Sequence, residues 1–100
     1  MMTGGLSDVQ PATPDIQKLA DQVSEDFNEN KENQSYPIFR AVDYKTQVVA
    51  GTNYFIKVDI GQGNYIHLRI FLPLPHTNEG PSLTSFQTGK VESDPLNYFD

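Results

Sequence analysis

Hydrophobic residues recur at a helical spacing near the start of this chain and at an alternating spacing after residue 38. Between residues 14 and 27 they fall three or four positions apart, on one stripe of an amphipathic helix: Ile16, Leu19, Ala20, Val23 and Phe27. Thr13 suits the N-cap of this helix, and Pro14 suits its first position. The pattern predicts a helix that begins at Pro14, frays in the Asn-rich segment 28–35 and ends before Pro37.

The later part of the chain predicts strands. Residues 38–48 and 52–60 are rich in Val, Ile, Tyr, Phe and Thr, and further strands are expected at 65–72 and around 83–88. The turn at 61–64 contains glycines, which tolerate positive φ. Three prolines and a glycine between residues 73 and 81 exclude regular structure and predict a stiff loop.

Alternation along these strands separates two faces of a sheet. One face carries Tyr54, Ile56, Val58 and Ile60, continued by Ile66, Leu68, Ile70 and Leu72. The other carries more polar residues, among them Lys57 and His67, and is predicted to face solvent. Arg40 interrupts the alternation of the first strand and predicts a bulge or an exposed end there. The fold class expected is α+β, an antiparallel five-stranded sheet wrapped around one helix that lies on its inner face.

The connection Gln47–Val48–Val49–Ala50–Gly51 is unusual for a hairpin bend. Such bends ordinarily carry Asn, Asp or Gly, and here only Gly51 meets that preference. Two valines at an exposed tip form a small apolar prominence, which favours contact with a partner. The alternative is a tip buried against the chain's own N-terminal segment or in a dimer.

Composition narrows the class of protein. One hundred residues form one domain, here 1–100, and the chain has no cysteine for disulfides, thiolate metal sites or nucleophilic catalysis. A formal charge of −6 argues against nucleic acid and anionic membranes as partners. We find no signal-peptide pattern and no apolar run of membrane-spanning length, so the default expectation is a cytoplasmic protein.

The candidate chemistry of the side chains is sparse. His76 lies in a proline-flanked loop, and neither it nor His67 has a metal-ligand partner at a suitable spacing. The serines stand in no catalytic motif, although a serine assisted by one of the histidines stays open. A ligand-binding or isomerase domain with one helix on a curved sheet is the rival class, and it generally needs a longer chain. We expect no enzyme activity, no cofactor and no metal.

Five stretches in the expected order resemble the stefins, the type 1 branch of the cystatins. The segment from Gln47 to Val58 resembles their first binding hairpin, and Leu74-Pro75-His76 resembles their second binding loop. Gly4 resembles the N-terminal glycine of that family. The stretch 10–13 matches the lead-in to the helix, and Tyr98-Phe99 resembles the aromatic end of the branch.

The resemblance implies a reversible, tight-binding inhibitor of papain-like cysteine proteases of the cathepsin type. It implies a wedge of three pieces: a mobile N-terminal trunk, residues 1–8, with Gly4; the bend with Gln47, Val48, Val49, Ala50 and Gly51; and the loop with Leu74, Pro75 and His76. An antiparallel meander would bring the two loops to the same end of the sheet. The alternative is a self-associating protein, a domain-swapped dimer with weak or no inhibition, although a monomer is the expected form.

Three features depart from the family pattern. Thr3 stands where relatives often have a cysteine, which removes thiol-linked dimerisation. The second loop is preceded by Pro73 and followed by Gly80-Pro81, which is expected to alter its tilt and the preferred protease. Asp100 extends past the aromatic pair and is expected to weaken the contact made by that end.

Overall fold

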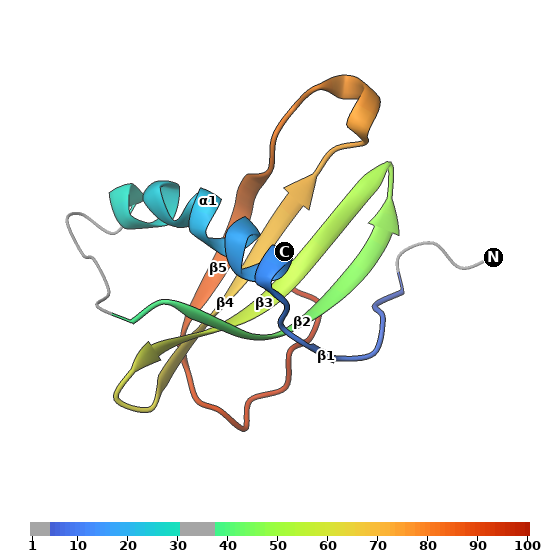
Figure 1. Cartoon of the computed structure of the whole chain (residues 1–100). Helices are drawn as coiled ribbons and strands as arrows, with labels where there is room; N and C mark the ends of the chain where they lie inside the picture. Colours follow the sequence, from blue (N-terminus) through green and yellow to red (C-terminus); the bar gives the residue numbers. More distant parts are fainter. Residues whose placement is uncertain (1–4, 31–37) are drawn as a thin grey trace.

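The structure is a computed structural model that describes residues 5–30 and 38–100 of the chain, with side chains described for all of these except residues 25–30. A five-stranded antiparallel sheet carries one long helix across one face (Figure 1). This confirms the predicted α+β architecture. The predicted trunk glycine, Gly4, and the predicted end of the helix, residues 31–37, lie outside the described residues, as does the side chain of Phe27.

Helix α1 (Pro14–Asn30) begins where the sequence predicts. The Thr13 hydroxyl accepts a hydrogen bond from the Ile16 N–H at 3.3 Å, which caps the first turn. The predicted apolar stripe is buried in one core cluster with residues of the inner sheet face: Ile16, Leu19, Ala20 and Val23 against Ile56, Val58, Ile66, Leu68 and Ile70. Gln17 ties the helix to the sheet, because its amide accepts from the Ala41 N–H at 2.8 Å and donates to the Phe39 carbonyl at 3.0 Å.

The strands follow one another across the sheet in chain order, and each neighbouring pair is antiparallel. They are β1 (Gln10–Pro11), β2 (Arg40–Val49), β3 (Gly51–Gly61), β4 (Asn64–Leu72) and β5 (Ser82–Lys90). The register of β2 on β3 shifts between Ala41 and Asp43, which confirms the predicted bulge. The turn between β3 and β4 has positive φ at Gly61, Gln62 and Gly63, as its composition predicts.

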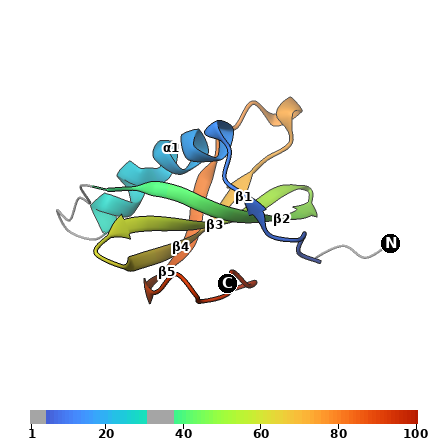
Figure 2. The ribbon, with the colours of Figure 1, turned by 60° about the horizontal axis from the view of Figure 1, so that its bottom comes forward.

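The outer face of the sheet is a second buried layer, and here the solvent-face prediction is wrong. His67 is 1% exposed, Lys57 is 6% exposed and Phe55 is fully buried, although alternation assigns all three to solvent. The cover is the C-terminal segment, residues 91–100, which runs beneath the sheet on the side opposite α1 (Figure 2). Leu96 of this segment is itself 4% exposed. The sheet therefore has buried side chains on both faces.

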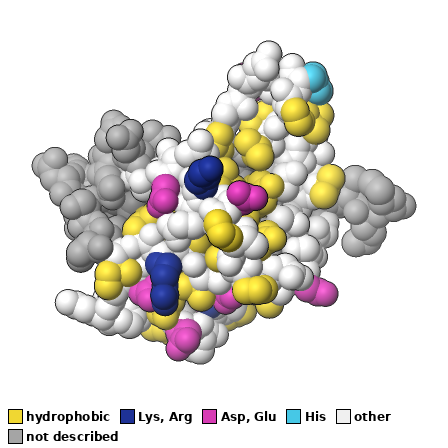
Figure 3. Space-filling model, viewed as in Figure 1, with side chains coloured by type: hydrophobic (Ala, Val, Ile, Leu, Met, Phe, Trp, Pro, Cys, Tyr) yellow, Lys and Arg dark blue, Asp and Glu magenta, His cyan; other side chains and the backbone are white. Residues whose placement is uncertain are grey.

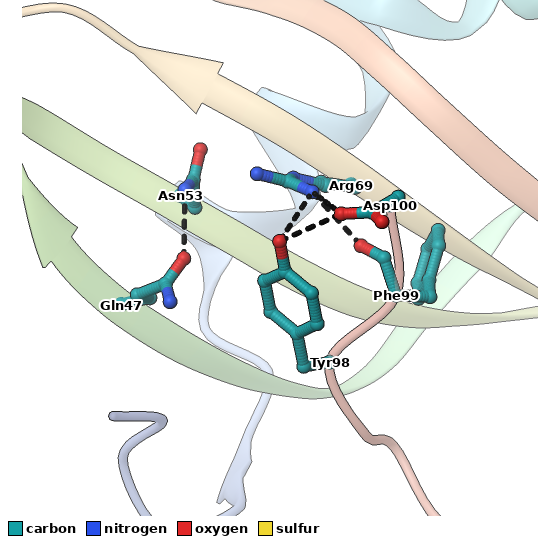
Figure 4. A network of polar contacts seen from close by, with 6 residues as sticks. All are labelled: Gln47, Asn53, Arg69, Tyr98, Phe99 and Asp100. Atoms are coloured by element: carbon teal, nitrogen blue, oxygen red, sulfur yellow. Dashed lines mark hydrogen bonds and ion pairs between the residues drawn. The ribbon is translucent and has the colours of Figure 1, made fainter. Parts of the chain in front are cut away.

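Backbone carbonyls of the C-terminal segment hold two cations of the outer face, the buried Lys57 and the partly buried Arg69. The Lys57 ammonium donates to the Glu92 and Asp94 carbonyls, each at 2.6 Å. The Arg69 guanidinium donates to the Phe99 carbonyl at 3.0 Å (Figure 4). Because a buried charge is costly without partners, these contacts fix where the C-terminal segment lies.

The aromatic end of the chain packs around Arg69. The guanidinium carbon lies 5.6 Å from the Phe55 ring centroid and 5.1 Å from that of Tyr98, within the range of cation–π attraction. Asp100 accepts a hydrogen bond from the Tyr98 hydroxyl at 2.7 Å and lies 3.5 Å from Arg69. The expectation that Asp100 weakens this end is therefore wrong, because its carboxylate adds two contacts.

Burial of His67 predicts a loss of stability in acid. Removal from water, together with the positive charges of Lys57 and Lys90 and against the opposing charge of Asp94, lowers the pKa of His67 to about 4. The unfolded chain binds this proton near pH 6.5, so between pH 6.5 and 4 it holds more protons than the folded chain. As the pH falls from 6.5 to 4, the free energy of unfolding should decrease by on the order of 2–3 kcal/mol because of this residue.

Urea unfolding at pH 7.5 and pH 4 of the unaltered chain and of His67→Gln measures this contribution. The unaltered chain should lose more stability between the two pH values than His67→Gln does. Equal losses in both proteins would show that His67 does not carry the acid sensitivity. Comparing the differences, rather than the absolute stabilities, removes the effect of the substitution on packing and of other titrating groups.

Candidate functional site

The bend between β2 and β3 presents its valines to solvent. Val48 is 65% exposed and Val49 is 39% exposed, and Ala50 between the two strands is also exposed. Val49 pairs with Gly51 directly across the bend, so only Ala50 lies outside the two strands. The prediction of an exposed apolar tip is confirmed, and the alternative of a tip buried within the chain does not apply to the described residues.

Gly51 holds this bend against the next strand. It is buried, with φ 125°, in a region that favours glycine. A Cβ atom at this position would lie 2.6 Å from the Leu72 carbonyl oxygen and 2.9 Å from the Phe71 ring. Only a residue without a side chain allows the bend to approach the end of β4 this closely.

Gln47 lies one residue before the exposed valines, and its side chain is buried. It is 6% exposed, and its amide oxygen accepts a hydrogen bond of 2.8 Å from the Asn53 side-chain amide (Figure 4). Asn53, also 6% exposed, pairs with Phe71 on β4. The alternation pattern assigns Asn53 and Phe71 to the solvent face, so sequence reasoning missed their place behind the bend. The available signal was an aromatic residue, Phe71, on a face expected to be polar.

The second loop connects β4 to β5 and is internally braced. It contains one turn of 3₁₀ helix, Pro75–Thr77, which corrects the prediction that the prolines exclude regular structure. The Thr77 hydroxyl donates to the Leu74 carbonyl at 2.8 Å, and the Asn78 N–H donates to the Pro75 carbonyl at 3.2 Å. Leu74 is 41% exposed, and Pro75 and His76 are exposed as well.

These two connections lie at the same end of the sheet, opposite the turn between β3 and β4 (Figure 1). We call this end, made of residues 48–51 and 73–81, the loop edge. Hydrophobic side chains gather along it in the space-filling view (Figure 3). Antiparallel connectivity thus brings together seven of the nine predicted site residues as surface or backbone of one edge; Gln47 is buried behind it and Gly4 is not described.

The N-terminal segment approaches the loop edge along β2. Gln10 and Pro11 pair with Tyr44 and Asp43, and the Ser7 N–H donates to the Thr46 carbonyl at 2.8 Å. Thr46 returns the contact, since its N–H donates to the Ser7 hydroxyl at 2.9 Å. The chain before Ser7 therefore departs near the loop edge. Mobility of the trunk stays a prediction, and it concerns the residues ahead of this pairing.

The side chains of the loop edge are suited to contact with a partner. Its only ionisable side chains are His76 and Glu79, and the Thr77 hydroxyl is engaged with a backbone carbonyl. The edge presents exposed apolar side chains on two braced loops. At its small residues the main chain lies close to the surface. Such a surface suits the binding of a macromolecular groove.

Comparison with known proteins agrees with this architecture. A family model described as the cystatin domain matches residues 4–93. Cystatin-B of Homo sapiens is 52% identical over 99 residues, which cover 99% of this chain and all of the relative. Stefin-C of Bos taurus is 51% identical over 96 residues, covering 96% of this chain and 94% of the relative. Cystatin-B of Bos taurus is 48% identical over 99 residues.

The chain belongs to the cystatin family. Its similarity to cystatin-B and stefin-C along nearly its whole length places it in the stefin branch of that family.

Proposed function

We propose that this chain is a reversible, tight-binding inhibitor of papain-like cysteine proteases and has no enzyme activity of its own. The observation that carries the proposal is the loop edge: two braced loops at one end of the sheet of a cystatin-family chain, with Val48 65% exposed and Leu74 41% exposed. A complex of this kind buries roughly 1,600 Å² with little change of backbone shape. Loops that are rigid before binding lose little conformational entropy when they dock.

Each part of the loop edge has a role in this proposal. Val48, Val49 and Leu74 supply apolar contact, and Ala50 and Gly51 let the main chain approach the wall of the active-site cleft. The 3₁₀ turn that begins at Pro75 and contains His76 holds the second loop in one conformation. Gly4 and the trunk occupy the opposite arm of the cleft, as the family resemblance implies.

Titration of active-site-titrated papain with the purified monomer tests the function. We expect residual activity to fall linearly to zero at one inhibitor per enzyme, and activity to return when the complex is diluted or challenged with excess substrate. Mass spectrometry should recover the inhibitor with its full mass. A chain that leaves papain active at a tenfold molar excess would remove the proposal.

The finer assignments belong to the same proposal. We take lysosomal cathepsins as the partners, the monomer as the inhibitory form and the cytoplasm as the location. A swapped dimer would have to straighten the Val48–Gly51 bend, and it would thereby lose the contact surface on which inhibition depends. Among the described residues, no helix has the length and apolar character needed to span a membrane.

Removal of residues Met1–Gly4 should weaken binding mainly through faster dissociation. The trunk adds contacts to a complex that the two loops have already formed, and such contacts act on the dissociation rate. Ordering each trunk residue costs about 1–2 kcal/mol of backbone entropy, so the net gain should be confined to the residues nearest the protease.

Surface plasmon resonance with immobilised papain separates the two rates. The matched control removes only Met1 and Met2 and leaves Thr3 and Gly4 in place; it should dissociate nearly as slowly as the full chain. If the longer deletion changed the association rate alone, the trunk would act in encounter and the proposed role would be wrong.

A further inference from the structure

A row of side chains crosses the outer face of the sheet directly behind the exposed bend. Gln47 on β2 lies opposite Asn53 on β3, and Asn53 lies opposite Phe71 on β4. Gln47 and Asn53 are joined by a hydrogen bond of 2.8 Å, and each is only 6% exposed. We call these three residues the supporting row (Figure 4 shows its two amides).

The bend itself has no polar side chain with which to fix its shape. Val48, Val49, Ala50 and Gly51 carry only hydrocarbon or hydrogen beyond the backbone. The supporting row therefore supplies the first side-chain hydrogen bond across the hairpin as one moves away from the tip. A buried hydrogen bond between two amides is directional, so it restricts the twist of β2 against β3 where an apolar contact would let them slide.

The supporting row also connects the two loops of the loop edge. The Phe71 ring and the Leu72 carbonyl form the surface on which Gly51 rests. The chain passes from Leu72 directly to Pro73, where the second loop begins. The first bend therefore packs on the residues from which the second loop departs. The relative position of the two loops depends on this contact.

We propose that Gln47 and Asn53 are positioning residues for protease binding, which hold the bend in its binding shape without touching the protease. The inference rests on the proposed inhibitory function and deepens it. It gives Gln47 a different role from the direct contact that the family resemblance implies, because its side chain is buried behind the valines.

A positioning role has a distinct kinetic signature. When a bend is free to leave its binding shape, the fraction of competent molecules falls, and the apparent association rate falls with that fraction. Once bound, the bend is held by the protease, so dissociation changes little. A residue that contacts the protease acts in the opposite way, mainly on dissociation.

The test compares Asn53→Leu with the unaltered chain in stopped-flow binding to papain. The leucine is similar in size but removes the amide group that donates to the Gln47 side-chain oxygen. We expect the association rate to fall about tenfold, the size of effect that a lost buried hydrogen bond produces, with dissociation changed less than twofold. The double exchange Gln47→Asn with Asn53→Gln restores an amide pair of the same total length and should return association to within about twofold of the unaltered chain.

Ile66→Val is the matched control for a general loss of stability. Ile66 is fully buried in the core and lies near the opposite end of the sheet, so this variant should lower Tm without slowing association. Amide relaxation measured by NMR on the free proteins gives a readout that does not use the protease. Residues 48–51 should gain mobility in Asn53→Leu and keep that of the unaltered chain in Ile66→Val.

Four results would overturn the inference: an unchanged association rate in Asn53→Leu, a change confined to dissociation, no recovery in the double exchange, or unchanged mobility of the bend. If Asn53→Leu does not fold, Asn53→Ser gives the same comparison with a side chain too short to keep the contact. Failure of the unaltered chain to inhibit papain would instead count against the proposed function, and the NMR comparison would still decide whether the supporting row holds the bend.

Discussion

The substitution Val49→Asp is expected to lose about 2 kcal/mol or more of binding free energy to papain, which corresponds to a weakening of at least about thirtyfold. Val49 lies at the bend and is 39% exposed in the free chain, so docking can bury the remainder of its surface. A carboxylate at this position must be stripped of water in an apolar contact that offers it no partner.

Val91→Asp is the matched control for this substitution. Val91 is 48% exposed and follows β5 at the end of the sheet away from the loop edge. The same change of valine to aspartate there should leave the inhibition constant within about twofold. Tm measurements on both variants should show small changes, since neither side chain belongs to the buried core. Unchanged affinity of Val49→Asp would remove the first bend from the binding surface.

The substitution Gly51→Ala is expected to lower both stability and inhibition. Its φ of 125° is strained for any residue with a side chain, which costs on the order of 1–3 kcal/mol. The new methyl group would also lie 2.6 Å from the Leu72 carbonyl oxygen, so the bend must move away from β4. Because that movement shifts Val48 and Val49 relative to the second loop, affinity should fall together with Tm.

Gly63→Ala separates the two causes. Gly63 has φ 76° and no atoms within 4 Å of the position that a Cβ would take, and it lies in the turn at the opposite end of the sheet. It should lose about 1–2 kcal/mol of folding stability from the left-handed conformation alone, with no loss of affinity. If Gly51→Ala inhibited papain as tightly as the unaltered chain, the close approach of the bend to β4 would have no part in binding.

The segments with a periodic hydrophobic pattern were predictable from the sequence, and the C-terminal segment, which has no such pattern, was not. The stripe from Ile16 to Val23 and the alternation through Ile56 and Val58 identify the inner core, because each side of a helix or strand repeats at its own spacing. The C-terminal segment has no such repeat. Alternation shows only that His67 and Lys57 share a face of the sheet. It could not predict that the C-terminal segment covers them.

The loop edge was predictable in outline for a related reason. Exposed valines at a bend conflict with turn preference, and that conflict is visible in the sequence. The supporting row produces no such conflict, since Gln47 and Asn53 are amides of the kind that ordinarily surround a turn. Asn53 pairs with Phe71, which belongs to another strand, so the register of β4 on β3 was needed to find the row.

The way in which Lys57 is held bears on how freely the tail of this protein can change. Its ammonium group is bound by the carbonyls of residues 92 and 94, which every amino acid possesses, and not by the carboxylates of Glu92 and Asp94. Replacement of Glu92 leaves its carbonyl available, whereas an insertion or deletion moves both acceptors out of reach; Asp94 is also needed for its carboxylate, which accepts from the Val91 N–H at 2.8 Å. At residue 92 the tail should therefore tolerate a change of side chain far better than a change of length, whereas Leu96 and Tyr98 are held through their side chains.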